Sequence, residues 1–309
     1  MEGVMRTTLA EEGLRLLSTG KVREIYELDS SRLLFVATDR VSAFDVVLDS
    51  PIPQKGSILT QISDFWFKLL SKEIPSLKTH LIHAGLPDAL EQTLKPEVAI
   101  QVQHRSMVVK KVNVLPIESI VRGYITGSAW TSYQNDGTFV GISLPSGLKE
   151  SQKLEQPIWT PSTKAEQGQH DENISAQEVA RIVGEDLARQ IERLSLLIYE
   201  KASAYAAKRG VIIADTKFEF GVDESTDPPS LTLIDEVLTP DSSRFWSATK
   251  YEIGRSQVSV DKQYLRDWLV ETSQKGKRGV AIPKQVAKDT SNRYNEAYQM
   301  LTGDPWDAK

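Results

Sequence analysis

The sequence predicts a mixed α+β fold in which blocks of β-strand are separated from amphipathic helices. Three observations support this prediction. Short β-rich runs fill residues 20–48, an alternating apolar and polar pattern marks a hairpin over 210–246, and apolar residues recur at helical spacing over 57–72, 175–210 and 283–301. A period of two is typical of a half-buried strand, and a spacing of three and four residues is typical of a helix.

Composition narrows the class of protein before any motif is considered. The chain has 309 residues, a formal net charge of −5 and no cysteine. This length suits about two domains. The negative charge gives no general attraction to nucleic acid, and the lack of cysteine excludes disulfides and thiolate metal sites. Because neither a secretory signal core nor a membrane-length apolar run is visible, we expect a cytoplasmic protein that binds neither nucleic acid nor membrane.

The first block of predicted strands opens with Gly20-Lys21-Val22-Arg23. A glycine at a strand turn, followed by two basic residues, can close over phosphates with backbone N–H groups and two cations. In isolation the motif is weak, and an ordinary surface turn explains it better.

The next two blocks read as structural. Residues 57–72 predict an amphipathic helix whose aromatic side chains belong to the core. Residues 98–114 are expected to return to strands, with Lys110 inside an apolar run where a nucleotide base could lie. His80 and His83 have an HxxH spacing, but no acidic neighbours favour a metal there.

Residues 115–130 place Arg122 and Ser128 around a short apolar piece that glycines flank on both sides. Glycine permits close backbone approach, and an arginine with a hydroxyl suits a phosphate. A helix–turn–helix junction with a surface arginine explains the pattern equally well. Residues 135–173 form a long polar loop of the kind that is either functional or mobile.

The second half is expected to hold one long helix, one hairpin and two final helices. Ser175 and Glu178 form a capping box at the start of the long helix. Gly184 predicts a break in it, and Gly210 predicts its end. The final helices are expected over 260–272 and 283–301.

The hairpin carries the most informative charges of the chain. On its first arm Asp215, Lys217 and Glu219 fall on one face, because a strand has a period of two. Its second arm, 231–238, is apolar on both sides and yet contains Asp235 and Glu236. Carboxylates inside a buried strand are costly unless a cation or several donors receive them.

Glu219 and Asp235 could together hold Mg²⁺, which prefers one or two carboxylates plus phosphate oxygens and water. Arg244, in the following turn, suits an anionic substrate. Acidic metal ligands beside Lys217 and Arg244 indicate a site that handles phosphates. A solvated strand face is the alternative.

With these pieces in order, the chain closely resembles the SAICAR synthetase family of purine biosynthesis. The resemblance spans Gly20 to Trp246 and rests on the stretches GKVREIYEL, ATDRVSAFDVVL, VRGYITGSAW, TPSTKAEQGQHDENIS, ADTKFEFG and LIDEVLTPDSSRFW. One small departure is Glu24, where related sequences often carry Asp.

The resemblance implies a β-rich part, residues 1–114, whose antiparallel sheet covers ATP in the manner of kinases and ATP-grasp enzymes. It implies an α+β part, residues 115–309, with the metal and substrate sites. The implied ligase reaction joins L-aspartate to the carboxylate of the carboxyaminoimidazole ribotide CAIR. The products would be SAICAR, ADP and phosphate, and the route would pass through an acyl phosphate. ATP and Mg²⁺ would be required, and the enzyme would be a monomer or a small homo-oligomer.

The resemblance also implies roles for individual residues. ATP would be bound by Gly20, Lys21, Arg23 and Lys110. Mg²⁺ would be held by Glu219 and Asp235. The transferring phosphoryl group would lie near Lys164 and Lys217, and Asp215 would bind the aminoimidazole or its ribose. CAIR would be bound by Arg122, Ser128 and Arg244. The candidates for orienting L-aspartate are Asp39, Ser42, Asp45, His170, Asp171 and Glu172.

Two other functions fit parts of the pattern. A small-molecule kinase would need the glycine turn, the lysines and the metal carboxylates, but it leaves Arg122, Ser128 and Arg244 unexplained. A nucleotide-binding protein without catalysis would have no need for the charges at Lys164, Lys217, Glu219 and Asp235.

Overall fold

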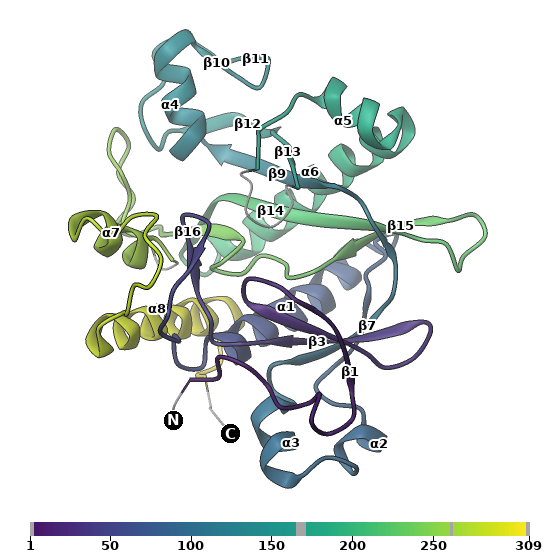
Figure 1. The fold of residues 1–309 in the computed structure, drawn as a ribbon. Helices are drawn as coiled ribbons and strands as arrows, with labels where there is room; N and C mark the ends of the chain where they lie inside the picture. Colours follow the sequence, from purple (N-terminus) through teal and green to yellow (C-terminus); the bar gives the residue numbers. More distant parts are fainter. Residues whose placement is uncertain (1–2, 165–170, 260–261, 307–309) are drawn as a thin grey trace.

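A computed structural model of the chain describes residues 3–164, 171–259 and 262–306. It contains two antiparallel sheets with a long helix between them (Figure 1). Within the described ranges, none of the helices is both long enough and apolar enough to cross a membrane.

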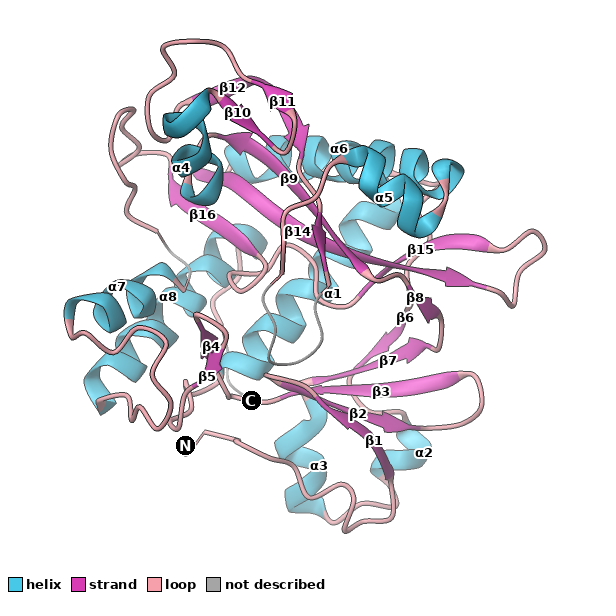
Figure 2. Ribbon diagram, turned by 45° about the horizontal axis from the view of Figure 1, so that its top comes forward, coloured by secondary structure: helices cyan, strands magenta, loops and turns pink. Residues whose placement is uncertain are grey.

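The first sheet has five strands in the order β1-β2-β3-β7-β6, and every neighbouring pair is antiparallel. Its strands are β1 (Arg15–Thr19), β2 (Arg23–Glu27), β3 (Arg32–Ala37), β6 (Leu81–Ala84) and β7 (Ser106–Lys110). Two short helices, α2 (Asp88–Glu91) and α3 (Pro96–Gln103), lie on its outer side, where Figure 2 shows them below the strands. The expected strands of residues 20–48 are confirmed, and the last of them forms the small hairpin β4 (Ser42–Ala43) and β5 (Val46–Val47).

The second sheet is built around the long strand β14 (Val211–Asp223). Antiparallel neighbours of β14 are β9 (Ile117–Tyr124), β15 (Ser230–Ile234), β16 (Ser243–Ser247) and β8 (Asn113–Val114). Strands β12 (Lys153–Trp159) and β13 (Ser162–Thr163) extend the sheet by pairing with β9. The predicted hairpin is therefore confirmed as β14–β15.

Helix α1 (Lys55–Glu73) joins the two sheets into one core (Figure 1). Its fully buried Trp66 belongs to a hydrophobic cluster that also contains Val109 of the first sheet and Phe218 of the second. The helix expected over 57–72 is thus confirmed. Because this cluster contains residues from both sides of position 114, the two halves that the sequence suggests share their packing.

The remaining helices cover the far side and one end of the second sheet. Helices α5 (Ala176–Val183) and α6 (Glu185–Ala207) are separated at Gly184, which has a φ of 89°. This confirms the predicted break. Helices α7 (Gln263–Glu271) and α8 (Lys284–Thr302) confirm the two final helices, and α8 ends at Gly303 as expected for a glycine in the left-handed conformation. Helix α4 (Gly127–Asp136) and the hairpin β10 (Thr138–Phe139) and β11 (Ile142–Ser143) complete the fold.

Three local expectations were wrong. The region 135–173, expected to be a long loop, contains the hairpin β10–β11 and the strands β12 and β13. The first half of 98–114 forms α3, which begins with a proline at its first turn and buries Val98, Ala99 and Val102 along one side. The second arm of the hairpin ends at Ile234. Asp235 then adopts a left-handed conformation with a φ of 65°, so its carboxylate leaves the strand instead of being buried within it.

Candidate active site

A cleft of about 380 Å³ lies where the first sheet faces β14. This volume is within the usual range for small-molecule sites, roughly 300–1,000 Å³. The cleft is lined by Ser18, Gly20, Lys21, Val22, Arg23, Ile25, Ser42, Glu118, Lys164, Asp171, Lys217, Glu219, Asp235, Glu236, Asp241, Ser242 and Lys262. Nine of the residues that the sequence singles out therefore come together here.

The glycine turn forms one wall of the cleft. The Gly20 N–H donates to the Arg23 carbonyl oxygen across 2.8 Å, which closes the turn. Arg40, buried behind it, donates to the carbonyl oxygens of Gly20 and Lys21 at 3.1 and 3.2 Å. Arg40 is not among the residues that the sequence singles out, although it belongs to the ATDRVSAFD stretch. Its interactions identify it as the group that fixes the shape of the turn.

Both basic side chains of the turn are held by carboxylates from distant parts of the chain. Lys21 pairs with Asp45 at 2.9 Å, and Arg23 pairs with Asp235 at 2.7 Å and with Glu236 at 3.3 Å. Burial by itself would lower the pKa of Arg23, but the carboxylates of Asp235 and Glu236 outweigh it and raise that pKa. Arg23 is therefore charged at every physiological pH.

A row of charged side chains runs along β9 and β14 on the cleft side. Lys217 pairs closely with Glu118 and lies 3.5 Å from Glu219, which in turn pairs closely with Lys164. Burial lowers the pKa of Lys217, yet Glu219 and Glu118 together raise it. The pKa of Glu118 is raised, chiefly by burial, although Lys217 opposes this. The period-two face of Lys217 and Glu219 is thus confirmed as the floor of the cleft.

At one end of this row lies a corner formed by two arginines and one aspartate. Asp215 on β14 is in register with Arg122 on β9 and with Arg244 on β16. Its carboxylate lies 2.9 Å from the Arg122 guanidinium and also pairs closely with Arg244. The Ser128 hydroxyl lies 3.4 Å from Arg122. Arg122 is buried, and its guanidinium lies 5.2 Å from the centre of the Phe139 ring, within cation–π range.

Two of the predicted site residues take other positions. Asp39 does not line the cleft: its carboxylate accepts from the Val4 and Gly56 N–H groups at 2.7 and 2.9 Å and pairs with Arg105 at 3.0 Å. Lys110, at the end of β7, pairs with Asp223 at 3.0 Å and also lies outside the cleft lining. His170 lies outside the described residues.

The two histidines of the HxxH motif, His80 and His83, lie in different surroundings. His80 is buried between Phe35 and Phe67, with ring centres at 5.5 and 5.6 Å, and burial lowers its pKa to about 4. His83 lies on the edge strand β6 and is exposed. Across the described ranges, no three His, Asp or Glu side chains are grouped closely enough to hold a metal by themselves.

The donor chemistry of the cleft nevertheless fits Mg²⁺ in its usual protein setting. Glu219 and Asp235 both line the cleft and both are paired with cations. Mg²⁺ is commonly held by one or two carboxylates with the remaining positions taken by substrate phosphates and water, so a preformed cage of three protein ligands is not required.

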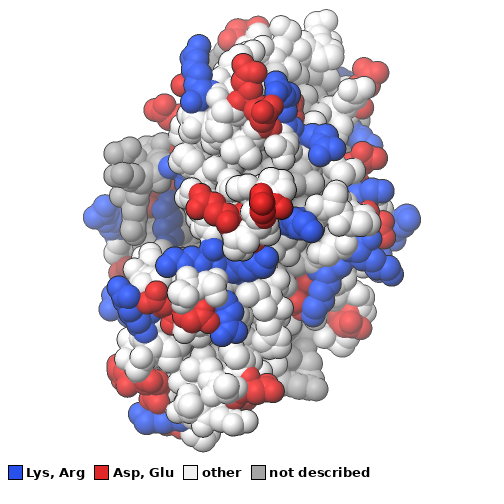
Figure 3. Space-filling view, turned by 90° about the vertical axis from the view of Figure 1, so that its right-hand side faces the viewer, with Lys and Arg blue, Asp and Glu red and all other residues white. Residues whose placement is uncertain are grey.

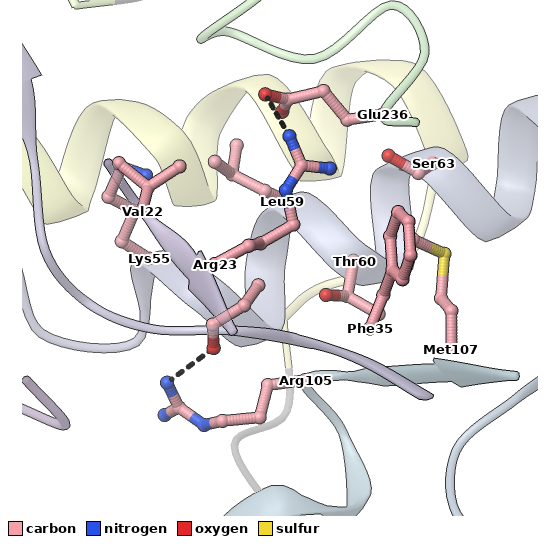
Figure 4. Close-up of a pocket in the computed structure, with 11 residues that line it drawn as sticks. Val22, Arg23, Phe35, Lys55, Leu59, Thr60, Ser63, Arg105, Met107 and Glu236 are labelled. Atoms are coloured by element: carbon pink, nitrogen blue, oxygen red, sulfur yellow. Dashed lines mark hydrogen bonds and ion pairs between the residues drawn. The ribbon is translucent and has the colours of Figure 1, made fainter. Parts of the chain in front are cut away.

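A second pocket lies directly behind Arg23 (Figure 4). It is lined by side chains of the first sheet and of α1, including Phe35, Met107, Leu59 and Thr60. Its volume of about 20 Å³ is room for about one water molecule, so it does not admit a nucleotide base in this conformation.

The structure adds a buried ionic cluster that sequence reasoning missed. Asp241 pairs with Lys55 at 2.9 Å and with Lys262 at 3.3 Å, and it accepts a hydrogen bond from the Tyr294 hydroxyl at 2.7 Å. Burial lowers the pKa of Lys262 despite this pairing, and the two lysines lower the pKa of Asp241 despite its burial. The signal available in the sequence was Asp241 within TPDSSRFW and the lysine of DKQYLRDWL, but nothing local connects them to Lys55.

The face shown in Figure 3 carries acidic and basic side chains side by side.

Comparison with known proteins shows which family the chain resembles. A profile of the SAICAR synthetase family matches residues 16–283. The chain is 52% identical over 297 residues to a phosphoribosylaminoimidazole-succinocarboxamide synthase of Pichia angusta, covering 95% of this chain and 96% of that protein. It is 50% identical over 301 residues to the enzyme of that name from Saccharomyces cerevisiae, with 95% and 96% covered.

Solved structures of the same family resemble this chain as well. A SAICAR synthase from Saccharomyces cerevisiae complexed with SAICAR superposes with a TM-score of 0.88 at 47% identity, covering 98% of this chain and 99% of that one. A SAICAR synthetase in complex with ADP superposes with a TM-score of 0.68 at 26% identity, covering 94% and 99%.

Proposed function

The chain belongs to the SAICAR synthetase family, and on that premise we propose that the cleft carries out the family's reaction. This reaction is the ATP-dependent joining of L-aspartate to the carboxylate of CAIR, giving SAICAR, ADP and phosphate. The observation that carries the proposal is the row of charges on β9 and β14, which runs from the two-arginine corner to the carboxylates opposite the glycine turn. Such a row can hold two phosphorylated ligands end to end.

We assign the glycine turn to ATP. Gly20 would let the turn approach the phosphates, Lys21 and Arg23 would bind them, and Arg40 would keep this turn in shape. Lys110, at the end of β7, would border the adenine. Residues 1–114 would thus act as the nucleotide-covering domain, and residues 115–309 would supply the metal and substrate sites.

The corner of Arg122, Ser128 and Arg244 is assigned to CAIR. Two guanidinium groups and a hydroxyl suit a ribose phosphate. Asp215, between the two arginines, would accept hydrogen bonds from the aminoimidazole or the ribose. Arg122 and Arg244 already share this carboxylate, so a bound phosphate would add a second anion to a site with two positive charges.

The chemistry that these residues would perform is charge neutralisation at a transferring phosphoryl group. A carboxylate oxygen of CAIR attacks the γ-phosphorus of ATP, the bond to the bridging oxygen breaks, and ADP leaves. The amine of aspartate then attacks the acyl carbon of the resulting acyl phosphate. The phosphate leaves with one former carboxylate oxygen, and the amine loses a proton. Lys164 and Lys217 would stabilise the charge on the transferring group.

Glu219 and Asp235 would hold Mg²⁺ beside the phosphates of ATP. When bound, the ion would neutralise phosphate charge and orient the γ-phosphoryl group. Arg23, Lys164 and Lys217 would have to exchange part of their present ion pairs for contacts with the ligand. Ser42 and Asp171, which line the cleft, are assigned to L-aspartate, together with His170. Asp39 would act indirectly, by fixing the start of α1 through the Gly56 N–H.

The test is release of ADP from ATP and Mg²⁺ with CAIR, measured with and without L-aspartate, together with mass detection of SAICAR. We expect release that requires both substrates and yields SAICAR. Release that does not depend on aspartate would instead support a kinase. Gel filtration with light scattering would test the further expectation of a monomer or a small homo-oligomer.

A further inference from the structure

The buried cluster around Asp241 contains two lysines but only one carboxylate. The ammonium groups of Lys55 and Lys262 lie 2.9 and 3.3 Å from the same oxygen, Oδ2 of Asp241. The other oxygen, Oδ1, accepts the hydrogen bond from Tyr294. One carboxylate, with a single negative charge, therefore serves two buried lysines.

Among the residues that the structure describes, no further carboxylate pairs with Lys262. Glu236 is the next acidic group to influence Lys262, but its carboxylate is already paired with Arg23 at 3.3 Å. Arg266, one helical turn after Lys262, adds a further positive charge. Among the described residues Arg266 makes no ion pair. An uncompensated buried charge is costly, so this cluster favours the entry of an anion.

Only one of the two lysines can meet a ligand from the cleft. Lys55 has 1% of its side chain exposed and lines the small pocket beside Arg23 instead. Lys262 has 10% exposed and lines the cleft itself, as do the serines Ser42 and Ser242. Lys262 and Ser42 present an ammonium group and a hydroxyl, which donate hydrogen bonds to a carboxylate or a phosphate. The Ser242 hydroxyl donates to the Thr239 carbonyl oxygen at 3.4 Å and would turn to the ligand.

The position of Ser242 relates this group to the rest of the site. Its carbonyl oxygen accepts from the Lys217 N–H at 2.9 Å, so it lies beside the strand that carries the proposed phosphoryl-binding lysine. Arg244 of the two-arginine corner is two residues further along, roughly 7 Å at the usual rise of a strand. Ser242, which lines the same cleft as Lys262, thus lies near both the proposed phosphoryl-binding lysine and the corner assigned to CAIR.

We propose that Lys262, with Ser42 and Ser242, binds a carboxylate of L-aspartate. This inference rests on the proposed function. Of the three anionic ligands in that function, ATP is assigned to the glycine turn and the ribose phosphate of CAIR to the Arg122 corner. The dicarboxylate is the ligand that still lacks a cation, and Lys262 is the cleft-lining lysine that the other two ligands do not use.

The test compares the unmodified enzyme with Lys262→Met and Lys262→Arg. The KM is measured for L-aspartate, CAIR and ATP in turn, with SAICAR detected by mass. Loss of one charge-assisted hydrogen bond predicts a rise in the KM for L-aspartate of about 10- to 150-fold in Lys262→Met. The KM values for ATP and CAIR should stay within about threefold, and Lys262→Arg should recover part of the loss.

Hydroxylamine distinguishes binding from a structural effect. This small amine has no carboxylate, so it can intercept an acyl phosphate without using the Lys262 subsite. ADP release with hydroxylamine, CAIR and ATP should be equal in the unmodified enzyme and in Lys262→Met. A structural role for Lys262 would lower the hydroxylamine and aspartate rates together. Lys288→Met, an exposed lysine of α8, is the matched control and should change none of these values.

Three outcomes would overturn the assignment. They are an unchanged KM for L-aspartate in folded Lys262→Met, an equal rise in the KM for ATP, and a parallel loss of the hydroxylamine rate. If Lys262→Met does not fold, Ser42→Ala tests the subsite in its place. This variant removes a hydroxyl from the small β4–β5 hairpin and should raise the KM for L-aspartate alone. An unchanged KM for L-aspartate would then overturn the assignment. If the unmodified enzyme makes no SAICAR, the proposed function itself is wrong and the subsite is withdrawn with it.

Discussion

Arg122 and Asp215 face each other in register across β9 and β14, and the guanidinium of one lies 2.9 Å from the carboxylate of the other. Arg244 reaches the same carboxylate from β16, on the other side of β14. The central strand thus holds one acidic side chain between two arginines, and the pair is oriented before any ligand arrives. A preorganised cation costs less to use in binding than one that must be ordered by the ligand.

Replacement of Arg122 by alanine should therefore weaken CAIR binding much more than ATP binding. Asp215 keeps Arg244 as a partner, so we expect the variant to fold. The KM for CAIR should rise about 10-fold or more, with the KM for ATP nearly unchanged. Steady-state kinetics with each substrate varied in turn measures this. Arg181→Ala, an exposed arginine on α5, is the control; equal rises for both substrates would mean that the corner is structural.

Gly127 provides an independent test of the same corner. A Cβ at this position would lie 2.7 Å from Nη2 of Arg244, and the backbone has a φ of 57°. Gly127→Ala should therefore displace the guanidinium and raise the KM for CAIR by roughly tenfold or more, the scale of one lost charge-assisted contact. Gly137→Ala is a matched control, because Gly137 has a φ of 75° but no atom within 4 Å of an added Cβ.

Both alanine variants carry a similar backbone cost of about 1 kcal/mol, since each places a side chain in the left-handed region. Thermal unfolding should consequently show comparable losses of stability for the two. Only Gly127→Ala should lose affinity for CAIR. A comparable KM for CAIR in the two variants would mean that Arg244 does not contact this substrate.

The sequence predicts the parts of the site that depend on local periodicity. Asp215, Lys217 and Glu219 share a face because β14 has a period of two, and that face is the floor of the cleft and its corner. Helix α1 follows from its apolar spacing, and the break before α6 follows from Gly184. In each case the physical cause acts over a few neighbouring residues.

Other parts depend on contacts between distant segments and could not be predicted this way. The end of β15 at Ile234 frees Asp235 to pair with Arg23, which is more than two hundred positions away. Arg40 reads as an ordinary charge in the sequence, yet it holds the glycine turn through three carbonyl oxygens. Asp39 resembles a ligand residue, but its carboxylate is taken up by Arg105 and by the start of α1.

Asp235→Asn tests the proposed metal site. The variant keeps the shape of the side chain but loses its charge, so one of two Mg²⁺ ligands is weakened. We expect activity to fall by roughly 100-fold or more, with a higher Mg²⁺ concentration needed for half-maximal rate. Circular dichroism should confirm that the fold is kept. Asp227→Asn, at the exposed tip of the β14–β15 hairpin, is the control; near-normal turnover at low Mg²⁺ in Asp235→Asn would remove Asp235 from the site.

Asp241→Asn should reduce stability and change its dependence on pH. Two buried ammonium groups would lose their shared carboxylate, and breaking a buried pair in this way costs about 3–5 kcal/mol. The lysines hold the pKa of Asp241 below its value of 3.8 in an unfolded chain. The unfolded state therefore binds this proton first as pH falls. The contribution of Asp241 to stability is complete above pH 3.8 and is lost below it.

Urea unfolding across a pH series measures both effects. Above about pH 5 the free energy of unfolding of Asp241→Asn should lie below that of the unmodified protein by a constant amount. Below pH 4 the two curves should converge, because only the unmodified protein has this group to protonate. Asp267→Asn, an exposed aspartate on α7, is the control and should follow the unmodified protein throughout. Parallel curves down to the lowest pH would show that the two lysines do not depend on the charge of Asp241.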